Sequence, residues 1–453
     1  MLRFAVMSKL IISVSGLRGV VGDSLTPEVA IRYVAAYAAT LPAGPVVVTR
    51  DGRHTGPMLA RAVQSALMAM GRRCLDGGIA ATPTTGVLVR HHGAVGGIQI
   101  SASHNPPEYN GLKLFDRTGR VIPTAPGQLV IDRYHEQSPY WMPFDRLGEL
   151  RPIEDTTIAH LAMIASICDI ERIKQRRFRV LLDANNGSGS VLGVPLLEEL
   201  GCQVTVLGAE PDGHFGHPPE PTAENLEVVL PLIRESEADI GFCQDPDADR
   251  LAIIDERGRY LGEEYTLAMC VDHVLRSTPG PVVTNCSTSR MTQDLAEKYG
   301  VPFFRSAVGE ANVVDLMLAE QAIIGGEGNG GAIDPRVGLV RDSFVGMALL
   351  LDAMASREQP ISALAAELPS YAIHKSKIDL PAEKVARALD ALENHFADAA
   401  PDRLDGLRLD WPNKWLLIRA SNTEPIVRVV AEAPTETEAA ELGSEASRAI
   451  SNL

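Results

Sequence analysis

The chain has 453 residues, with 42 Lys and Arg against 58 Asp and Glu, which gives a formal net charge of −16 at pH 7. Such a length predicts about three domains, and a content of 45% hydrophobic and 22% charged residues is typical of a soluble globular protein and excludes a disordered chain. An acidic chain repels phosphate backbones and anionic lipid, so we expect no nucleic acid and no membrane among its partners.

The cysteine content indicates a reducing compartment. Six cysteines are scattered along the chain without a C-x-x-C pair, which argues against a structural zinc site and against a disulfide framework. No apolar run is long enough to span a bilayer, and residues 1–10 do not resemble a signal peptide because Lys9 interrupts their apolar stretch. We therefore expect a cytoplasmic protein.

A strand, a polar turn, a helix that ends at glycine and a second strand recur three times along the chain. The three copies are residues 44–75, 178–207 and 280–305. Apolar β-branched runs joined by helices of 3.6-residue period are typical of βαβ units. Three such units at domain-sized intervals predict three similar α/β domains.

Each copy is followed by another apolar strand that leads into a polar loop. The loops are residues 101–106 (Ser-Ala-Ser-His-Asn-Pro), 245–250 (Asp-Pro-Asp-Ala-Asp-Arg) and 325–331 (Gly-Gly-Glu-Gly-Asn-Gly-Gly). Ligands of α/β folds bind beyond the carboxyl ends of the strands, so the three loops could face one shared cleft.

The last part of the chain breaks this pattern. A helix at 382–396, strands at 415–418 and 426–431 and a closing helix at 435–450 predict a smaller α+β domain. The predicted fold class is therefore α/β, with three similar mixed α/β domains and a smaller C-terminal domain around one central cleft. The predicted domains are residues 1–150, 151–256, 257–370 and 371–453.

The aspartate loop is the strongest candidate for a metal site. Asp245, Asp247 and Asp249 alternate along a turn, and three carboxylates so close together can converge on one hard cation such as Mg²⁺. With Glu256 they also match EF-hand positions, but Arg250 stands where that loop needs glycine and strands flank it, so we reject an EF-hand. A solvated acidic turn remains the alternative.

The serine loop places the hydroxyl of Ser103 beside the imidazole of His104 at the end of a strand. In isolation such a segment is more often a plain turn, because a serine hydroxyl is a weak nucleophile unless it is activated or already carries the group to be transferred. Beside a Mg²⁺ loop it becomes a candidate phosphoryl carrier. Lys113 and Arg18 offer nearby cations, although each alone would be an ordinary surface or loop residue.

Two later loops offer groups for a sugar phosphate. Glu327 and Asn329 lie in the glycine-rich loop and suit hydrogen bonding to sugar hydroxyls, with a hairpin turn as the alternative. Residues 419–425 (Arg-Ala-Ser-Asn-Thr-Glu-Pro), followed by Arg428, combine guanidinium groups, hydroxyls and turn amides that can grip a phosphate dianion. A hairpin tip with incidental arginines is the alternative there.

Two further polar segments are predicted to be structural. Residues 51–55 read as a turn that leads to a helix N-cap at Thr55. His91 and His92 read as a pair at the C-terminus of a helix, where a cation is favourable, rather than as metal ligands.

Taken together, the motifs resemble those of a known family. Five segments, 15–19, 101–106, 245–250, 326–330 and 419–425, occur in the order of the α-D-phosphohexomutases, which include phosphoglucomutases, phosphomannomutases and phosphoglucosamine mutases. The resemblance implies a heart-shaped, four-domain enzyme with one active site in its central cleft. By the same resemblance, we expect an intramolecular phosphotransferase that uses Mg²⁺ and a hexose 1,6-bisphosphate, acts on small sugar phosphates, and exists as a monomer or homodimer.

The resemblance also implies roles for individual residues. Ser103 would carry the phosphoryl group, and Mg²⁺ would be held by an oxygen of that phosphoserine and by three carboxylates. Phosphoserine would phosphorylate a hexose monophosphate, and the bisphosphate would turn over and return its other phosphate. The metal-binding carboxylates would be Asp245, Asp247 and Asp249; the residues beside the transferred group Arg18, His104, Lys113 and Arg250; and the substrate-binding residues Glu327, Asn329, Arg419, Ser421, Asn422, Thr423 and Arg428.

The proton of the attacking hydroxyl needs a base, and His104 and Lys113 are the candidates; Lys113 would need a depressed pKa to serve. Many members have Ser-Gly-His where this chain has Asn-Gly-Gly at 329–331, and a lysine where it has Ala307. The Asn-Gly-Gly form resembles the subgroup called phosphoglucosamine mutases, which implies a hexosamine phosphate. Phosphomannomutase or phosphoglucomutase activity is the alternative, followed by a Mg²⁺-dependent sugar phosphatase with Asp245 as acceptor and a non-enzymatic Ca²⁺- or sugar-binding protein.

Overall fold

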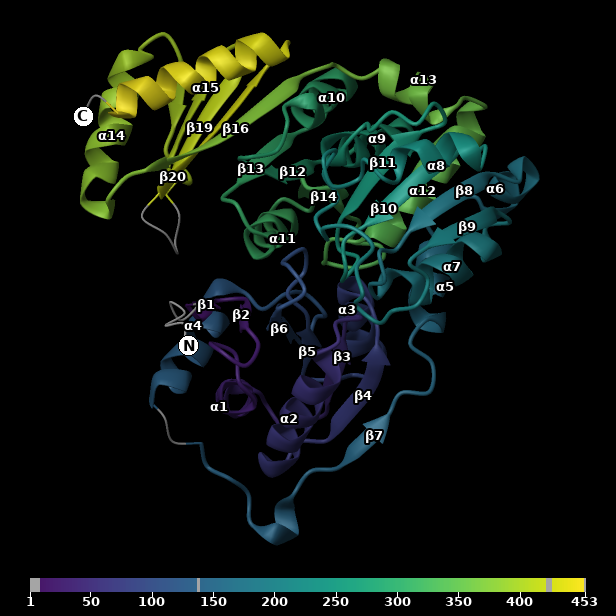
Figure 1. Ribbon diagram of the computed structural model, residues 1–453, viewed down its shortest axis with the longest axis vertical. Helices are drawn as coiled ribbons and strands as arrows, with labels where there is room; N and C mark the ends of the chain where they lie inside the picture. The colour runs from purple at the N-terminus through teal and green to yellow at the C-terminus, as the bar shows by residue number, and fades with distance from the viewer. Residues whose placement is uncertain (1–8, 137–138, 421–425, 452–453) are drawn as a thin grey trace, which may run out of the picture.

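The computed structural model describes residues 9–136, 139–420 and 426–451. The described residues form four sheets that follow one another along an arc, with the N-terminal sheet and the C-terminal sheet at its two ends (Figure 1). We name the corresponding units domains I to IV, after the domains predicted above. The predicted fold class, three similar α/β domains and a smaller α+β domain, is confirmed.

Domain I contains a seven-stranded sheet of order β1-β2-β6-β5-β3-β4-β7. Its first helix begins where the sequence specifies a helix start, since Thr26 caps it by accepting a hydrogen bond from the Val29 amide and Pro27 follows. The elements are β1 (Ile11–Ser13), β2 (Gly16–Val20), α1 (Pro27–Thr40), β3 (Val46–Arg50), α2 (Gly56–Ala69), β4 (Cys74–Ile79), α3 (Thr82–His91), β5 (Gly96–Ile100), β6 (Tyr109–Asp116), α4 (Thr124–Glu136), the short 3₁₀ turn η1 (Phe144–Arg146) and β7 (Leu150–Pro152).

Domains II and III repeat the inner part of this sheet. Their sheets have the orders β11-β10-β8-β9 and β13-β12-β14-β15, in which three parallel strands are followed by one antiparallel strand. Domain II comprises α5 (Ile158–Ala165), α6 (Ile170–Arg176), β8 (Arg179–Asp183), α7 (Gly189–Glu199), β9 (Gln203–Leu207), α8 (Leu230–Glu235), β10 (Ile240–Gln244) and β11 (Leu251–Asp255). Domain III comprises α9 (Glu263–Ser277), β12 (Val282–Asn285), α10 (Met291–Tyr299), β13 (Phe303–Ser306), α11 (Glu310–Ala319), β14 (Ile324–Glu327), β15 (Gly331–Ile333), α12 (Ser343–Arg357) and α13 (Ile361–Ala366).

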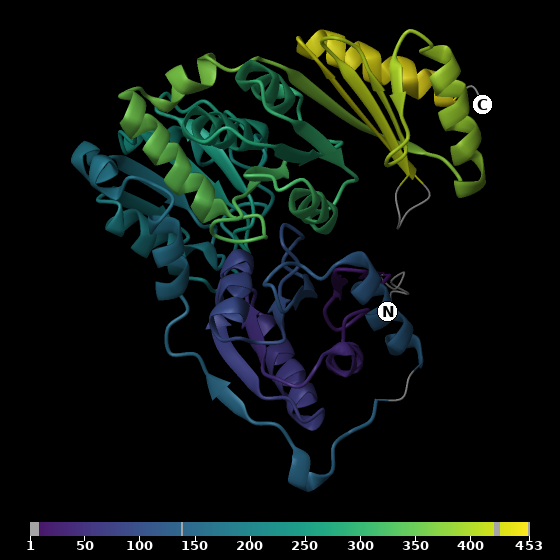
Figure 2. The same cartoon turned by 180° about the vertical axis from the view of Figure 1, so that it is seen from behind.

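Domain IV has a different sheet, of order β16-β20-β19-β18-β17, in which all neighbouring strands are antiparallel. Figure 2 shows from behind that its two helices lie on one side of this sheet. The elements are β16 (Ala372–Asp379), α14 (Ala382–His395), β17 (Ala400–Asp402), β18 (Leu407–Asp410), β19 (Trp415–Ala420), β20 (Ile426–Ala433) and α15 (Glu436–Ser451).

Domains II and III share one hydrophobic core, whereas domains I and IV each have their own. Phe242 of domain II and Leu267 and Phe344 of domain III are fully buried in the shared cluster. Burial of large apolar side chains from both domains stabilises the contact between domains II and III. Within the described residues, no helix combines the length and the apolar character that a membrane span requires.

A buried polar junction fixes domain I against this pair. The imidazole of His160, on α5, lies with Nδ1 3.0 Å from Thr84 Oγ1 of domain I and with Nε2 2.7 Å from Asp342 Oδ2 of domain III. The other oxygen of Asp342 accepts hydrogen bonds from the Phe344 and Val345 amides and so caps α12. Because buried polar groups need their partners, this junction sets the relative placement of the three domains.

Candidate active site

The serine loop joins β5 to the antiparallel strand β6 and carries Ser103 at a left-handed turn with φ of 50°. Its hydroxyl is buried and donates a hydrogen bond of 2.8 Å to Asp245 Oδ2 of domain II. The His104 Nδ1 atom lies 3.3 Å from the same hydroxyl. The structure therefore brings the candidate phosphoryl carrier against the aspartate loop, although 142 residues separate Ser103 from Asp245 in the chain.

The segment at residues 51–55, which the sequence presents as a helix start, is the support of the serine loop. Asp51 accepts from the Ser101 hydroxyl at 2.7 Å, and that hydroxyl accepts from the Ser103 amide at 2.8 Å. The buried Arg53 binds Asp51 through Nε at 3.1 Å. Its terminal nitrogens donate to four loop carbonyls: Ser103 (2.6 Å), Asn105 (2.6 Å), Pro106 (2.7 Å) and Tyr109 (3.0 Å).

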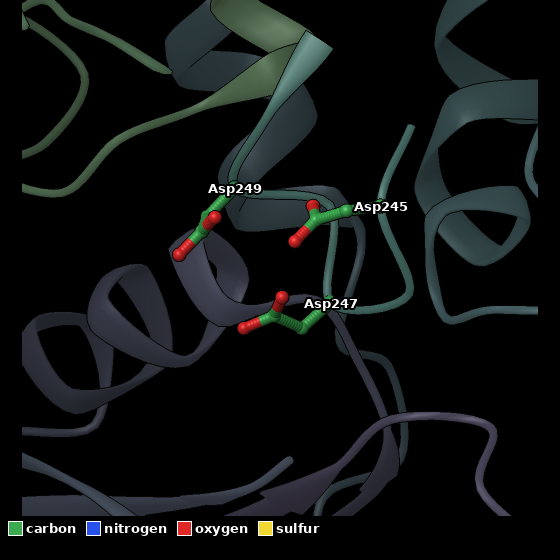
Figure 3. Close-up of side chains that lie close together, drawn as sticks. All are labelled: Asp245, Asp247 and Asp249. Atoms are coloured by element: carbon green, nitrogen blue, oxygen red, sulfur yellow. The ribbon is translucent and has the colours of Figure 1, made fainter. Parts of the chain in front are cut away.

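The aspartate loop joins β10 to β11, so strands flank it, as expected when the EF-hand was rejected. Asp245, Asp247 and Asp249 are fully buried, and one oxygen of each lies within 4.8 Å of the others (Figure 3). Ala248 adopts a left-handed conformation with φ of 55° that turns the chain between the second and third carboxylates.

The three carboxylates fit a hard divalent cation. Asp247 Oδ1 and Asp249 Oδ1 are buried without a hydrogen-bond partner, which is costly for a carboxylate unless a cation binds there. Oxygen donors of this kind are the ligands that Mg²⁺ prefers. Burial raises the pKa of Asp245, and the neighbouring Asp247 and Asp249 raise it further, so the cluster gains from any added positive charge.

Lys113 already supplies part of that charge. Its Nζ lies 3.1 Å from Asp247 Oδ2 and 2.8 Å from Asp249 Oδ2. Burial lowers the pKa of Lys113, but Asp247 and Asp249 outweigh it and the net shift is upward. The depressed pKa that a base at this position requires is therefore not present in the ligand-free site, where Lys113 is an ammonium group.

Two arginines from outside the serine loop, Arg18 of β2 and Arg250 before β11, influence His104. Arg18 donates to Asn105 Oδ1 at 3.1 Å, and Arg250 pairs with Glu220 at 3.3 Å. Burial, together with the charges of Arg250 and Arg18, lowers the pKa of His104 from 6.5 to about 2. The imidazole is therefore neutral near pH 7, where it can accept a hydrogen bond but adds no positive charge.

Glu327 is the last residue of β14 rather than part of a flexible loop, and it pairs in register with Gly331 of β15. Its Oε1 accepts from Asn285 Nδ2 at 2.7 Å and from the Gly309 amide at 3.1 Å. Asn329 Oδ1 is buried without a partner, so it has an acceptor to offer. Both groups lie at the β14–β15 hairpin, the position in domain III that corresponds to the two loops just described.

Two adjoining pockets extend from the serine loop to domain IV. One, of about 390 Å³, is lined by Arg18, Lys113, His104 and Arg428 among others, and the second, of about 450 Å³, is lined by His104, Arg419 and Arg428. Because the two pockets share His104 and Arg428, the serine loop and the cations of domain IV lie along one groove. Ser421, Asn422 and Thr423 fall outside the described residues.

Several groups at this site were missed by the sequence reasoning. Lys375 and Lys377 line the second pocket from β16, and their i, i+2 spacing on a strand places them on one face, a signal that was available. Glu310 and Arg341 are buried beside Asp249, and neither stands in a recognisable motif.

Comparisons with known proteins cover nearly the whole chain. Four models named for phosphoglucomutase/phosphomannomutase match, those of alpha/beta/alpha domains I, II and III at residues 9–141, 159–258 and 263–371, and that of the C-terminal domain at 377–449. A phosphoglucomutase/phosphomannomutase of Thermococcus kodakarensis is 37% identical, over 94% of this chain and 95% of its own. A probable phosphoglucosamine mutase of Methanopyrus kandleri is 34% identical, over 95% of each.

Solved structures with the same architecture include a putative phosphomannomutase from Thermus thermophilus, at a TM-score of 0.84 and 25% identity over 98% of this chain and 100% of that one. A family protein from Burkholderia thailandensis also has a TM-score of 0.84, at 27% identity over 97% and 98%. The N-acetylphosphoglucosamine mutase of Aspergillus fumigatus, in complex with GlcNAc-6P and magnesium, shares the fold at a TM-score of 0.55 and 15% identity over 94% and 98%.

Proposed function

Because this chain belongs to the phosphoglucomutase/phosphomannomutase family and is a phosphohexomutase, we propose that Ser103 carries the phosphoryl group that it moves between the 1- and 6-positions of a hexose, and that the preferred hexose is a hexosamine. The observation that supports Ser103 most is its buried hydroxyl, which donates at 2.8 Å to Asp245, a member of the cluster in which Asp247 and Asp249 have unpartnered oxygens.

The metal ion of the site would be Mg²⁺, held by Asp245, Asp247 and Asp249, and when bound it supplies charge stabilisation for the transferred phosphoryl group. The orphaned carboxylate oxygens favour this assignment, and the Aspergillus fumigatus protein of the same fold binds magnesium. A hexose 1,6-bisphosphate would serve as activator and intermediate.

The protein's own groups surround the transferred phosphoryl group. Arg18 and Arg250 would orient its equatorial oxygens and offset their negative charge during in-line transfer. His104, neutral and with Nδ1 3.3 Å from the Ser103 hydroxyl, would share a hydrogen bond with that hydroxyl and help to orient it. Lys113 would act through its positive charge unless the arrival of a second cation at the carboxylates lowers its pKa.

The far end of the groove would hold the phosphate that does not react. Arg419 and Arg428 provide guanidinium groups for it, and Lys375 and Lys377 add charge from β16. Ser421, Asn422 and Thr423 would complete this grip, by resemblance to the family. A bisphosphate needs a cationic region at each end of the sugar. Arg18 and Lys113 in one pocket and Arg419 and Arg428 in the other support this arrangement.

Glu327 and Asn329 would bind the sugar hydroxyls between the two phosphate sites, since Asn329 offers a buried acceptor without a partner. The preference for hexosamine rests on the Asn-Gly-Gly sequence at 329–331 and on relatives named probable phosphoglucosamine mutase. Relatives are also named phosphoglucomutase/phosphomannomutase, so glucose and mannose phosphates are the competing substrates.

The test is to incubate the purified protein with glucosamine, glucose and mannose 1-phosphates, Mg²⁺ and a trace of the 1,6-bisphosphate. We expect 6-phosphates, fastest from glucosamine, and one acid-stable phosphoryl group on the peptide that contains Ser103. Ser103→Ala should abolish both, whereas Ser166→Ala, which removes an exposed hydroxyl of domain II, should abolish neither. Release of inorganic phosphate with a labile acyl-phosphate on Asp245, and no phosphate on Ser103, would refute the assignment in favour of a phosphatase.

A further inference from the structure

Arg341 is a buried arginine between β15 and α12 whose guanidinium group binds three carboxylates. Nη2 donates to Asp249 Oδ2 at 2.7 Å, Nε donates to Glu310 Oε2 at 3.0 Å, and Nη1 lies 3.1 Å from Glu327 Oε2. Asp249 belongs to the aspartate loop and Glu327 to the glycine-rich hairpin, so one side chain connects the two loops.

We propose that Arg341 is a positioning residue that fixes the metal-binding carboxylate and the sugar-binding carboxylate relative to each other. The inference rests on the proposed function, because it takes Asp249 as a metal ligand and Glu327 as a sugar ligand. The planar guanidinium group suits this role, because its N–H groups point in fixed directions and one flexible partner cannot satisfy all of them.

The contacts of each carboxylate show which of its oxygens Arg341 fixes. Asp249 Oδ2 binds both Lys113 and Arg341, which leaves Oδ1 as the unpartnered oxygen. Glu327 is fixed at both oxygens, by Asn285 and the Gly309 amide on one side and by Arg341 on the other. A rotation of either carboxylate would break these contacts, so Arg341 determines the angle at which each oxygen meets its ligand.

The balance of charge gives this role a measurable signature. Asp247, Asp249, Glu310 and Glu327 are four buried carboxylates, and Lys113 and Arg341 are the cations paired with them among the described residues. Removal of Arg341 leaves the cluster more negative, which strengthens the attraction for a divalent cation while the orientation of both loops is lost. A purely structural role would instead weaken metal binding as the site loosens.

Gly331 gives a way to displace Arg341 without changing its charge. A Cβ atom at Gly331 would lie 2.4 Å from Cδ, 2.7 Å from Cγ and 2.8 Å from Cβ of Arg341, so the stem of the arginine occupies the space beside this glycine. Such approaches are too short for real atoms, and two of the three atoms lie near the backbone, where the arginine cannot simply swing aside. Gly331→Ala therefore moves the guanidinium group and retains the positive charge.

The experiment compares Arg341→Gln, Arg341→Lys and Gly331→Ala in the full chain, with Arg257→Gln as control, because Arg257 is 67% exposed and pairs with Glu256 at the surface. The readouts are Mn²⁺ binding to the purified protein by electron paramagnetic resonance, and kcat and KM for hexosamine 1-phosphate. For Arg341→Gln we expect Mn²⁺ affinity about tenfold higher and kcat about 100-fold lower, as for a misplaced reacting group.

Arg341→Lys should keep the Mn²⁺ affinity of the wild type with an intermediate kcat, and Gly331→Ala should lower kcat without tighter Mn²⁺ binding. The proposal is overturned if Arg341→Gln binds Mn²⁺ no more tightly than the wild type, or if its kcat is unchanged. If that variant does not fold, wild-type kcat in both Arg341→Lys and Gly331→Ala overturns the proposal. A wild type without Mn²⁺ binding and without phosphate on Ser103 would refute the proposed function itself.

Discussion

Replacement of Arg53 by methionine should release the serine loop from the rest of domain I. The side chain is 1% exposed, and it donates to four carbonyls of the loop while its Nε binds Asp51. Methionine retains a stem of similar length and removes every donor, so the apolar packing changes little and the hydrogen bonds are lost together. The loop should then open more often, and with it the left-handed turn at Ser103.

The magnitude follows from the contacts. Breaking a buried ion pair costs about 3–5 kcal/mol, and each hydrogen bond from a charged donor contributes about 1.5–3 kcal/mol, although these terms are not additive. Burial already raises the pKa of Asp51, so in the variant this carboxyl can take up a proton and recover part of the loss. We therefore expect opening of the loop to become easier by about 3 kcal/mol, which corresponds to about 100-fold in the opening equilibrium.

Hydrogen exchange of the full chain measures this opening directly. Amides of residues 101–110 should exchange about 100-fold faster in Arg53→Met, whereas those of domain IV should be unaffected. The matched control is Arg73→Met, because Arg73 is 51% exposed and pairs with Glu149 at the surface of the same domain. Exposed ion pairs contribute about 0–1 kcal/mol, so in Arg73→Met the exchange of residues 101–110 should change less than about fivefold. Unchanged exchange at 101–110 in Arg53→Met would refute the supporting role.

Two further outcomes concern the attachment of domain IV and the pH dependence of domain II. Arg408 stacks 4.1 Å from the Trp415 ring and donates a hydrogen bond to the Cys286 carbonyl of domain III. Arg408→Met should therefore loosen domain IV, raise KM for the sugar phosphate severalfold and increase the radius of gyration measured by X-ray scattering. An unchanged radius of gyration would contradict this. Burial lowers the pKa of His217, but its hydrogen bond and charge interaction with Asp183 outweigh burial, and the net shift is upward. The protonated His217 therefore stabilises the folded state fully below pH 6.5, and this stabilisation is lost as pH rises through the raised pKa. The melting temperature of wild type should exceed that of His217→Gln more at pH 6 than at pH 9, and an equal difference at both would contradict the assignment.

The strands and loops that form the candidate active site could be predicted from the sequence because their signals are local. A β-branched run followed by a polar turn identifies a strand and its end, and the parallel order of the sheets then places the loop ends together. The aspartate loop carries its own chemistry in six residues, so it needed no knowledge of distant parts of the chain. Similar reasoning found the fold class, since each repeat contains a complete βαβ pattern.

The supporting residues could not be found in this way, because their partners are far away in sequence. Arg53 acts on carbonyls about 50 residues later, and Arg341 acts on a carboxylate 92 residues earlier. A buried arginine has no local signature, and Thr55 and Pro57, which are typical of a helix start, concealed the role of Arg53. Thr55 itself makes no capping hydrogen bond and instead accepts one from Asn110 Nδ2 at 2.9 Å.

The three corresponding loops share a backbone device that explains how a repeated fold produced one site. Ser103, Ala248 and Gly330 each have positive φ, of 50°, 55° and 77°, at the turn between a parallel strand and its antiparallel neighbour. Glycine adopts this conformation freely, whereas for Ser and Ala it costs about 1–2 kcal/mol per residue, which the surroundings must offset.

The strain at Ser103 and at Ala248 is compensated by different contacts. At Ser103 the neighbouring Ser101 hydroxyl and Arg53 hold the amide and the carbonyl, so the strain is compensated within domain I. At Ala248 the carbonyl accepts from the Ser343 hydroxyl at 2.7 Å, a residue of domain III at the start of α12. The aspartate loop thus depends on the shared II–III core for its shape, whereas the serine loop does not. Changes in the placement of domain III should therefore reach the carboxylates before they reach Ser103.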